Sequence, residues 1–438
     1  MGVFQQGLSG LTSSQKSLEV TANNVANSNT VGFKSSKAQF GDVYANTLAQ
    51  TSAGLATGDG VNVVKIRQEF RQGNVISTQN PLDLAISGDG FFKVQDSDGT
   101  EFLTRNGQFG LDADNNIVSN TGFKVLGYPV ANDTGNVLDV AVPIQIETDP
   151  IAPKATDSTT FRFNLDSRVD IPPAANFQTF DANDPETYVY SSAIVVNNQL
   201  GEPKPMQVFW ARPDAATAPG PNQWQVHATV DGTEVPIRVR GNPGDAFTAA
   251  GAGGVALDFN NDGTLVDPDL SRFEVDVTGL TPEFKGADAN GERIIAIDMR
   301  NSTQFGTDFH WQNLDQDGYD AAEFVNVTFS ETGIMSQNYA NGESIQVAKV
   351  TLSKFRNPEG LQPVGNNNWR ATLQAGPEFS NNAGDKGFGQ VSAGAVEEAN
   401  VDLTSELVEM IATQRVYQAN SKSIQAQDTL LQTVTNLS

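Results

Sequence analysis

The stretch ANNVANSNTVGFK, residues 22–34, closes an amphipathic segment with a run of Asn, Ser and Thr that leads to Gly-Phe-Lys. The side chains of Asn27 and Asn29, like the hydroxyls beside them, compete for backbone hydrogen bonds. Gly32 tolerates a left-handed or otherwise special backbone conformation. The sequence therefore predicts that a first helix stops here and that a different kind of structure follows.

Upstream of this stop, apolar side chains recur at alternating intervals of four and three residues. The series comprises Phe4, Leu8, Leu11, Leu18 and Val25, with Gln15 and Ala22 completing it. Near the other end of the chain the same spacing connects Leu403, Leu407, Met410, Tyr417, Ile424 and Leu431, with Gln414, Ser421 and Asp428 between them. Such a seam of period 3.5 predicts a long helix at each end that packs against a helical partner, although ordinary surface helices are amphipathic too.

The opposite faces of both expected helices carry uncharged amides and hydroxyls. They include Gln5, Gln6, Ser13, Asn23, Asn24, Gln425, Gln427 and Gln432. Within residues 1–30 only Lys16 and Glu19 are charged. These faces are therefore polar but almost free of charge.

Between the two ends the apolar period changes from 3.5 to 2. Alternating apolar residues mark strands at 224–230, 235–239, 255–259 and 273–277, and turn sequences such as Asp231-Gly232 separate them. This pattern predicts half-buried antiparallel strands. The expected fold class is mainly β with α-helical termini.

The length of 438 residues exceeds what one hydrophobic core supports, so several domains are expected. Segments rich in Pro, Asp, Thr or Gly begin near residue 146 and again at 284–294, and they bracket an insertion. The expected organisation is a helical coiled-coil domain at 1–30 and 400–438, connecting segments at 31–69 and 360–399, an inner antiparallel β domain at 70–145 and 294–359, and an outer antiparallel β domain inserted at 146–293.

The chain is strongly acidic and contains no cysteine. Its 27 Lys and Arg against 52 Asp and Glu give a net charge of -25, which repels nucleic acid and anionic membranes. Without cysteine there can be no disulfide, thiolate zinc site or cysteine nucleophile. No apolar run approaches the roughly 18 residues of a membrane helix, and the first residues lack the pattern of a cleaved signal peptide. If the protein is exported, we expect another route.

One loop resembles a calcium site. DFNNDGTLVDPD matches the EF-hand pattern at Asp258, Asn260, Asp262 and Gly263, with Asp269 where the bidentate Glu belongs. Strand patterns flank this loop instead of helices. A hairpin turn is therefore the favoured interpretation of residues 258–269, and calcium binding is left open.

Other motifs give no catalytic, cofactor-binding or metal site. GAGGVA at 251–256 fits a loose dinucleotide pattern, but a strand follows it where a helix is required. His227 falls on the polar face of an expected strand and His310 in an expected loop. Neither has a serine elbow or a partner at metal-ligand spacing. We therefore predict a protein that is not an enzyme.

The opening stretch closely resembles the signature of bacterial flagellar rod and hook proteins, in which a helix is followed by an Asn-rich turn and Gly-Phe-Lys. The matching residues are Asn23, Asn24, Asn27, Asn29, Gly32 and Phe33. Four further blocks resemble the same family: FRQGNVISTQNPLDLAISGDGFFKV at 70–94, LTRNGQFGLDADNNIV at 103–118, GLQPVGNNNW at 360–369, and the segment from GAVEEANVDL to the last TNL at 394–437. Residues 146–293 do not carry the signature.

The resemblance implies a structural subunit that polymerises into a flexible tube. In this family the terminal helices form an inner tube and the β domains stack outside it. The length and the insertion favour hook subunits, which join rod to filament as a universal joint that transmits torque. A distal rod subunit and a hook–filament junction subunit remain alternatives, as do an extracellular β-domain adhesin and a hydrolase.

The same resemblance implies the partners and the location. The partners would be further copies of the chain, the rod, the hook cap, the hook–filament junction proteins and the flagellar type III export apparatus, with neither nucleic acid nor membrane insertion. The location would be extracellular. The amides Gln5, Gln425 and Gln432 are expected to line a central export channel, or alternatively to pack against neighbouring helices.

Overall fold

The computed structural model describes residues 2–43, 60–130, 140–170, 180–212, 222–239, 254–266, 272–278, 280, 284, 293–385 and 387–437. The chain divides into two compact units. The terminal unit comprises residues 1–148, 325–338 and 344–438, and the inserted unit comprises 149–324 and 339–343. The fold class is mainly β with one helix at each end, which confirms the expectation from sequence.

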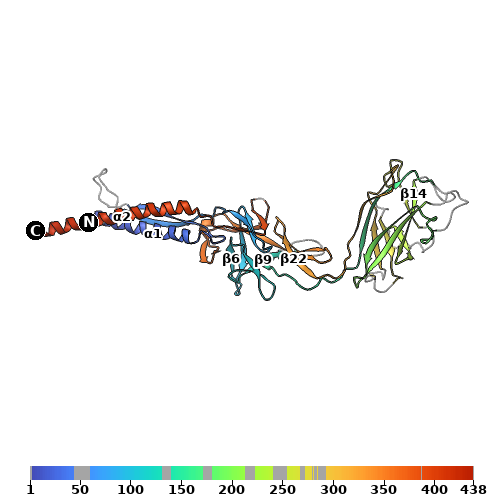
Figure 1. The fold of residues 1–438 in the computed structure, drawn as a ribbon, viewed down its shortest axis with the longest axis horizontal. Helices are drawn as coiled ribbons and strands as arrows, with labels where there is room; N and C mark the ends of the chain where they lie inside the picture. Colours follow the sequence, from blue (N-terminus) through green and yellow to red (C-terminus); the bar gives the residue numbers. More distant parts are fainter. Residues whose placement is uncertain are drawn as a thin grey trace. The chain divides into compact units, whose positions relative to one another are not determined.

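Two helices and a β-hairpin form one part of the terminal unit (Figure 1). Helix α1 spans Gly2–Ala26 and helix α2 spans Leu403–Leu437. The hairpin consists of β1 (Ser36–Val43) and β2 (Gly60–Gln68), which pair antiparallel with a register shift between Gln39 and Phe40. The expected connecting segment 31–69 is therefore β structure in large part, because it pairs with itself.

The remaining strands of the terminal unit are short, except for the 12-residue β24. They are β3 (Val75–Ser77), β4 (Leu84–Ser87), β5 (Phe91–Gln95), β6 (Glu101–Thr104), β7 (Phe109–Leu111), β8 (Ile117–Ser119), β9 (Lys124–Pro129), β10 (Val142–Pro143), β22 (Phe324–Phe329), β23 (Ile334–Tyr339), β24 (Ser344–Phe355), β25 (Gln362–Gly365), β26 (Asn368–Arg370), β27 (Glu378–Asn382), β28 (Gln390–Ala393) and β29 (Ala395–Glu397), with a 3-10 turn at Pro358–Gly360. Most of them belong to a 12-stranded sheet with the path β22-β23-β24-β9-β5-β6-β26-β25.

In this unit, strands that are far apart in the sequence pair with one another. β28 pairs with β4 and β29 with β3, both antiparallel, so residues 390–397 lie beside residues 75–87. Close by, the rings of Phe70, Phe91 and Trp369 meet edge to face, with centroids 5.6 to 5.7 Å apart. The expected connecting segment 360–399 thus contributes strands and core, and the sequence interpretation was wrong there because short edge strands have too few residues for a visible period.

The inserted unit is a pair of β-sheets. One has six strands: β11 (Ser158–Asp166), β16 (Ile237–Val239), β18 (Arg272–Asp276), β19 (Ile294–Asp298), β20 (Thr303–Phe305) and β21 (His310–Gln316). The other has five: β12 (Tyr190–Asn197), β13 (Pro203–Ala211), β14 (Gln223–Val230), β15 (Thr233–Val235) and β17 (Val255–Asp258).

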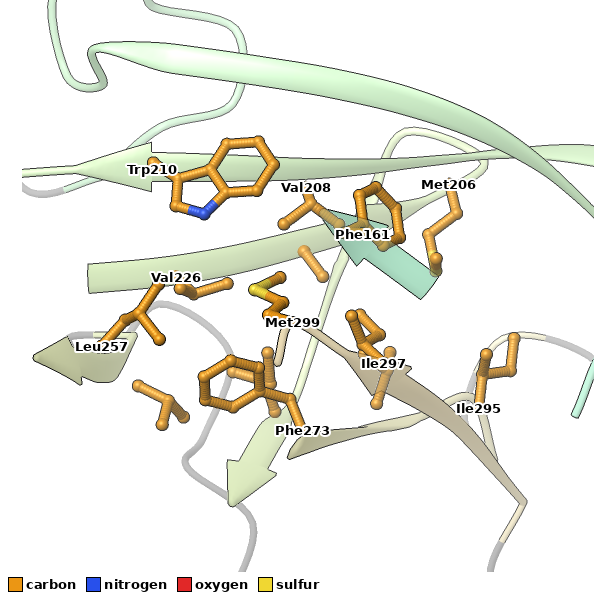
Figure 2. Packing of buried hydrophobic residues seen from close by; sticks show 14 of the residues in the cluster. Phe161, Met206, Val208, Trp210, Val226, Leu257, Phe273, Ile295, Ile297 and Met299 are labelled. Carbon is orange, nitrogen blue, oxygen red and sulfur yellow. The ribbon is translucent and has the colours of Figure 1, made fainter. Parts of the chain in front are cut away.

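The apolar positions of the two sheets share one core. Figure 2 shows Trp210, Val208 and Val226 of the five-stranded sheet facing Phe273, Ile297 and Met299. Trp224, Val226, Ala228 and Val230 are all buried, as their alternation predicts. Each fully buried Val, Ile, Phe or Met side chain of this core contributes roughly 1.5 to 3 kcal/mol relative to leaving it in water.

Three expectations about this unit were wrong. The inserted unit does not end at residue 293, because later strands still pair with its strands. β19 pairs with β11 and β18, and β21 pairs with β11. The sheets are not purely antiparallel, since β11 is parallel to both β19 and β20. Residues 235–239 are two strands, β15 pairing with β14 and β16 with β18, because Pro236 interrupts the ladder between them.

Candidate functional site

The first helix stops where the sequence predicts, through side chains of its own last turn. Asn27 donates through Nδ2 to the carbonyl of Asn23 at 3.0 Å, and Thr30 donates through its backbone N–H to the carbonyl of Asn27 at 3.0 Å. Asn29 is exposed and Phe33 is half-buried. The turn therefore redirects the chain instead of continuing α1.

Gly32 lies at the closest approach of this turn to the β body. Its φ is +72°, and a Cβ placed there would lie 2.5 Å from the backbone nitrogen of Asn106. Its own N–H donates to the carbonyl of Glu397 at 2.7 Å. Only glycine fits, because both the conformation and the space exclude a side chain.

A buried ionic cluster follows immediately. The Nζ of Lys34 donates to Oε1 of Glu397 at 2.6 Å and to the carbonyl of Arg71 at 2.7 Å. The Nη1 of Arg105 donates to Oε2 of Glu397 at 3.1 Å, and the N–H of Gly73 donates to Oε1 at 2.8 Å. All three charged side chains are nearly inaccessible to solvent. We name Lys34, Glu397 and Arg105 the joint cluster.

The joint cluster holds two cations around one carboxylate. Burial lowers the pKa of Lys34, and the charge of Glu397 opposes that shift. Burial likewise lowers the pKa of Arg105, again against the attraction of Glu397. Removing the carboxylate would leave two buried charges unpaired, which is costly. Glu397 therefore ties the segments around residues 34, 105 and 397 to one another.

Two asparagines complete the joint. Asn400 accepts from the N–H of Ser35 at 2.7 Å and donates to the carbonyl of Glu69 at 2.6 Å. Asn24, which is buried, donates to the carbonyl of Ser36 at 2.8 Å and to Oε1 of Glu406 at 3.1 Å. Both amides thus bridge the amino-terminal and carboxy-terminal segments.

Helices α1 and α2 lie side by side in antiparallel directions (Figure 1). Gly7 lies against Ile424 and Gly10 against Asn420, while Asn24 bonds Glu406. The face of α1 that carries Gly7, Gly10 and Asn24 also carries three small hydroxyl residues at intervals of three and four, namely Ser14, Ser17 and Thr21. Small side chains let two helix backbones approach closely. This face, not the leucine seam, forms the helix pair within one chain.

The predicted seam of α1 lies on an adjacent face, about 100° around the helix from the pairing face. Phe4 is 44% exposed and Leu8 is 49% exposed, whereas Leu11, Leu18 and Val25 are half-buried. A third side of α1 carries the β1–β2 hairpin, where Ser13 donates to the carbonyl of Val61 at 3.3 Å. The described part of the chain therefore leaves Phe4 and Leu8 open and covers the rest of the apolar seam about halfway.

Part of the predicted seam of α2 lies on the side that faces α1. Met410, Tyr417 and Ile424 are half-buried on the pairing side, together with Glu406, Asn420 and Gln427, and Thr413 is buried there. Leu403 and Leu407 are 46% and 44% exposed, and Ile411 beside them is 51% exposed. The side chain of Leu431 is outside the described residues. An apolar face of α2 thus also remains open.

The residues of the expected polar faces, which include the proposed channel lining, differ in exposure. Gln5, Gln425 and Gln432 are exposed, as is Asn23. Ser13 and Asn24 are buried instead, because the hairpin and α2 cover them, so their placement on an open polar face was wrong. Gln427 is half-buried on the pairing side of α2, and Gln6 is half-buried too.

The residues weighed as chemical sites are structural. His227 is buried and stacks on Phe180 with ring centroids 3.9 Å apart, so its expected place on a polar face was wrong. Burial lowers the pKa of His227 despite the nearby Glu234. His310 begins β21 and is not in a loop. β21 pairs with β11, about 150 residues earlier in the chain, so no local turn or apolar period marks it as a strand.

The calcium-like loop folds as a tight turn. The N–H of Gly263 donates to the carbonyl of Asn260 at 3.0 Å, and Asp262 accepts from the hydroxyl of Thr264 at 2.6 Å. Asp269 and residues 251–253 of GAGGVA are outside the described residues. Within the part of the chain that the structure describes, no group of three His, Asp or Glu side chains is placed to hold a metal ion.

Sequence reasoning missed the joint cluster. Lys34, Arg105 and Glu397 stand in three of the quoted signature blocks and Gly73 in a fourth. Asn367 of the fifth block donates to the carbonyl of Val31 at 2.9 Å. All five blocks therefore meet at this joint, which is the physical link between their separate positions in the chain.

Neither of the described helices is long and apolar enough to cross a membrane.

Comparison with known proteins gives four family matches. Residues 4–34 match the flagella basal body rod protein family and residues 85–172 match the flagellar hook protein FlgE/F/G D1 domain. Residues 164–319 match the flagellar basal body protein FlaE D2 domain, and residues 392–437 match the flagellar basal body rod FlgEFG protein C-terminal family.

Curated relatives cover the whole chain. The flagellar hook protein FlgE of Escherichia coli strain K12 is 34% identical over 439 residues, with 99% of each chain covered. The flagellar hook protein FlgE of Treponema pallidum is 29% identical over 469 residues, with 98% of each covered. The crystal structure of Helicobacter pylori flagellar hook protein FlgE2 matches in fold with a TM-score of 0.51 at 14% identity, over 72% of this chain and 98% of that one.

Proposed function

The chain belongs to the flagellar hook protein family, and we propose that copies of it assemble through the open apolar faces of α1 and α2. As a member of that family it is a structural subunit of the bacterial flagellar hook. The proposal concerns how one copy binds the next. The two helices and the joint that holds them are its structural basis.

The observation that carries the proposal is the exposure of apolar side chains on both helices. Phe4, Leu8, Leu403, Leu407 and Ile411 keep between 44% and 51% of their surface in solvent. A soluble helix normally turns such residues inward. Burying the remaining half of each against a neighbouring copy would stabilise the contact by about 1 kcal/mol per residue, half of the full transfer value.

The remaining partners and the location follow from this role. We propose that the polymer contacts the rod, the hook cap and the hook–filament junction proteins, and that subunits reach the cell exterior through the flagellar type III export apparatus. The protein works by assembly and bending, transmitting torque as a universal joint, and not by catalysis. Polar β surfaces suit subunits that must slide on one another, because transient interfaces are the more polar class.

The exposed amides Gln5, Gln425 and Gln432 support a second role for the helices. In a tube of paired helices they would line the central channel as an almost uncharged wall, over which unfolded export substrates of either charge pass without binding. Substituting all three by Lys should slow export of acidic filament subunits. Normal export by a variant that still assembles would contradict the channel role and favour packing between helices.

The assembly proposal is tested with point variants of the full-length chain. Leu8→Asn and Leu407→Asn should abolish tubes at ammonium sulfate concentrations where the parent chain polymerises, as seen by sedimentation and negative-stain electron microscopy. Leu200→Asn is the matched control, because Leu200 is 63% exposed in the inserted unit. Circular dichroism checks that all variants fold alike. Tubes from both helix variants at the parent concentration would refute the proposal.

A further inference from the structure

A polar groove borders the helices at the joint. It is lined by α1, β1, residues 69–74 and the start of α2, and its volume is about 910 Å³. Four carboxylates stand along it: Glu69, Asp402, Glu406 and Glu409. Against them the lining offers only Lys37 and Arg71 as cations. The groove therefore carries an excess of negative charge.

Three of these carboxylates are already engaged. Glu69 pairs with Arg71 at 2.7 Å, and Asp402 caps α2 by accepting from the N–H of Thr404 at 3.0 Å. Glu406 accepts from Asn24 at 3.1 Å. Glu409 is exposed and has no hydrogen-bond or ion-pair partner among the described residues. It is the carboxylate of the groove that can bind another molecule.

Two cations of α2 also lack a hydrogen-bond or ion-pair partner among the described residues. In α1, Lys16 pairs with Glu19 at 2.7 Å, and in α2, Asp428 accepts from Gln432 at 3.0 Å. Arg415 and Lys422 of α2 are both exposed, and neither has a hydrogen-bond or ion-pair partner within the ranges that the structure describes. Among the charged side chains of the two helices, Glu409, Arg415 and Lys422 are the ones with neither a hydrogen-bond nor an ion-pair partner in the described residues.

These three residues lie on different sides of α2. At 3.6 residues per turn, Arg415 is about 120° and Lys422 about 140° around the helix from Glu409. One flank of the helix thus presents a free anion inside an acidic groove, and the other flank presents two free cations one heptad apart. Opposite charges on opposite flanks favour head-to-tail contact between copies, the arrangement that generates rings and helical tubes.

We propose that the groove of one copy receives α2 of the next copy, with Glu409 bound by the Arg415 and Lys422 flank. The proposal rests on assembly through α1 and α2. Copies with a net charge of -25 repel one another as a whole, so a local attraction of this kind selects the register in which apolar faces meet. Pairing with Arg415 offsets neighbouring helices by about 9 Å along their axes, and pairing with Lys422 by about 20 Å.

The test exchanges the charges in the full-length chain. In low salt, Glu409→Lys should raise the lowest subunit concentration that gives tubes about tenfold, because it replaces an attraction by a repulsion. Arg415→Glu or Lys422→Glu in the same chain should restore that concentration to within about twofold. The double variant that restores it identifies the contact and hence the offset. A higher sodium chloride concentration should bring the subunit concentration that Glu409→Lys needs for tubes closer to that of the parent chain.

Glu186→Lys is the matched control, since Glu186 is exposed in the inserted unit and its substitution changes the net charge equally. The proposal is overturned if Glu409→Lys polymerises like this control, or if neither double variant restores assembly. Failure here is distinguishable from failure of the assembly role. If Leu8→Asn blocks tubes while Glu409→Lys does not, the helices assemble copies but this charge contact does not exist.

Discussion

Glycine acts in two separable ways at the residue scale. Gly32 and Gly122 both have a positive φ, +72° and +81°, but only at Gly32 does another backbone lie within reach of a Cβ. Gly122→Ala should therefore cost about 1 to 2 kcal/mol for conformation alone. Gly32→Ala should cost at least about 2 kcal/mol more, because Asn106 must move. Urea unfolding, monitored by amide exchange at residues 31–36, measures the loss of unfolding free energy in both variants. Equal losses would contradict the close approach at Gly32.

The joint cluster gives a second prediction at this scale. Glu397→Gln should destabilise the terminal unit by about 3 to 5 kcal/mol, because Lys34 and Arg105 stay buried without an anion. Adding Lys34→Met should recover part of that loss, since one unpaired cation is removed. The same urea titration measures single and double variants. A single variant as stable as the parent chain would show that the cluster does not hold the joint together.

Acid stability of the inserted unit depends on Asp166. The Arg168 side chain, which donates to both carboxylate oxygens, lowers the pKa of Asp166 from 3.8 to about 2. A depressed pKa contributes stability that is present above pH 3.8 and lost as the pH falls through 2. Asp166→Asn should flatten the decline in melting temperature between those values, whereas Asp320→Asn at an exposed position should not. An unchanged slope in Asp166→Asn would contradict this.

At the element scale, the pairing of α1 with α2 depends on small residues. Gly7→Leu should separate the helices, because a Cβ at Gly7 would already lie 2.9 Å from Cγ1 of Ile424. Ala22→Leu is the control, since Ala22 is exposed on the open face of α1. We expect Gly7→Leu to lose its helical ellipticity at a lower temperature than the parent chain. Ala22→Leu should lose it at the same temperature as the parent. Equal melting of the two variants would mean that α1 does not meet α2 through Gly7.

Periodicity gave the helices but not their contacts. The seam from Phe4 to Val25 placed a helix where the structure has α1, because an apolar repeat needs only local geometry to be visible. Which face meets α2 was decided by Gly7, Gly10 and Asn24, whose side chains are small or polar and add nothing to an apolar repeat. The strand alternation of residues 224–230 correctly predicted the buried side chains from Trp224 to Val230, but not the burial of His227 and Thr229 on the other face, which distant residues such as Phe180 cover.

At the scale of the whole molecule, charge opposes assembly and apolar burial favours it. A chain with a net charge of -25 should polymerise more readily as ionic strength rises, because repulsion between copies is screened. Ammonium sulfate should act at lower ionic strength than sodium chloride, since sulfate also strengthens apolar burial. Turbidity and sedimentation in both salts measure this. Equal effects at equal ionic strength would mean that screening alone controls assembly.

The sequence by itself determined the class of the fold, the terminal helices, the strand cores and the family, because each of these depends on local spacing or on motifs that can be compared directly. Only the tertiary structure decided that Lys34, Arg105 and Glu397 meet, that β19 and β21 belong with β11, and which faces of α1 and α2 stay open. These depend on pairs of segments that lie more than 100 residues apart in the chain. The apolar period of a segment shows neither which distant segment packs against it nor which of its faces that partner covers.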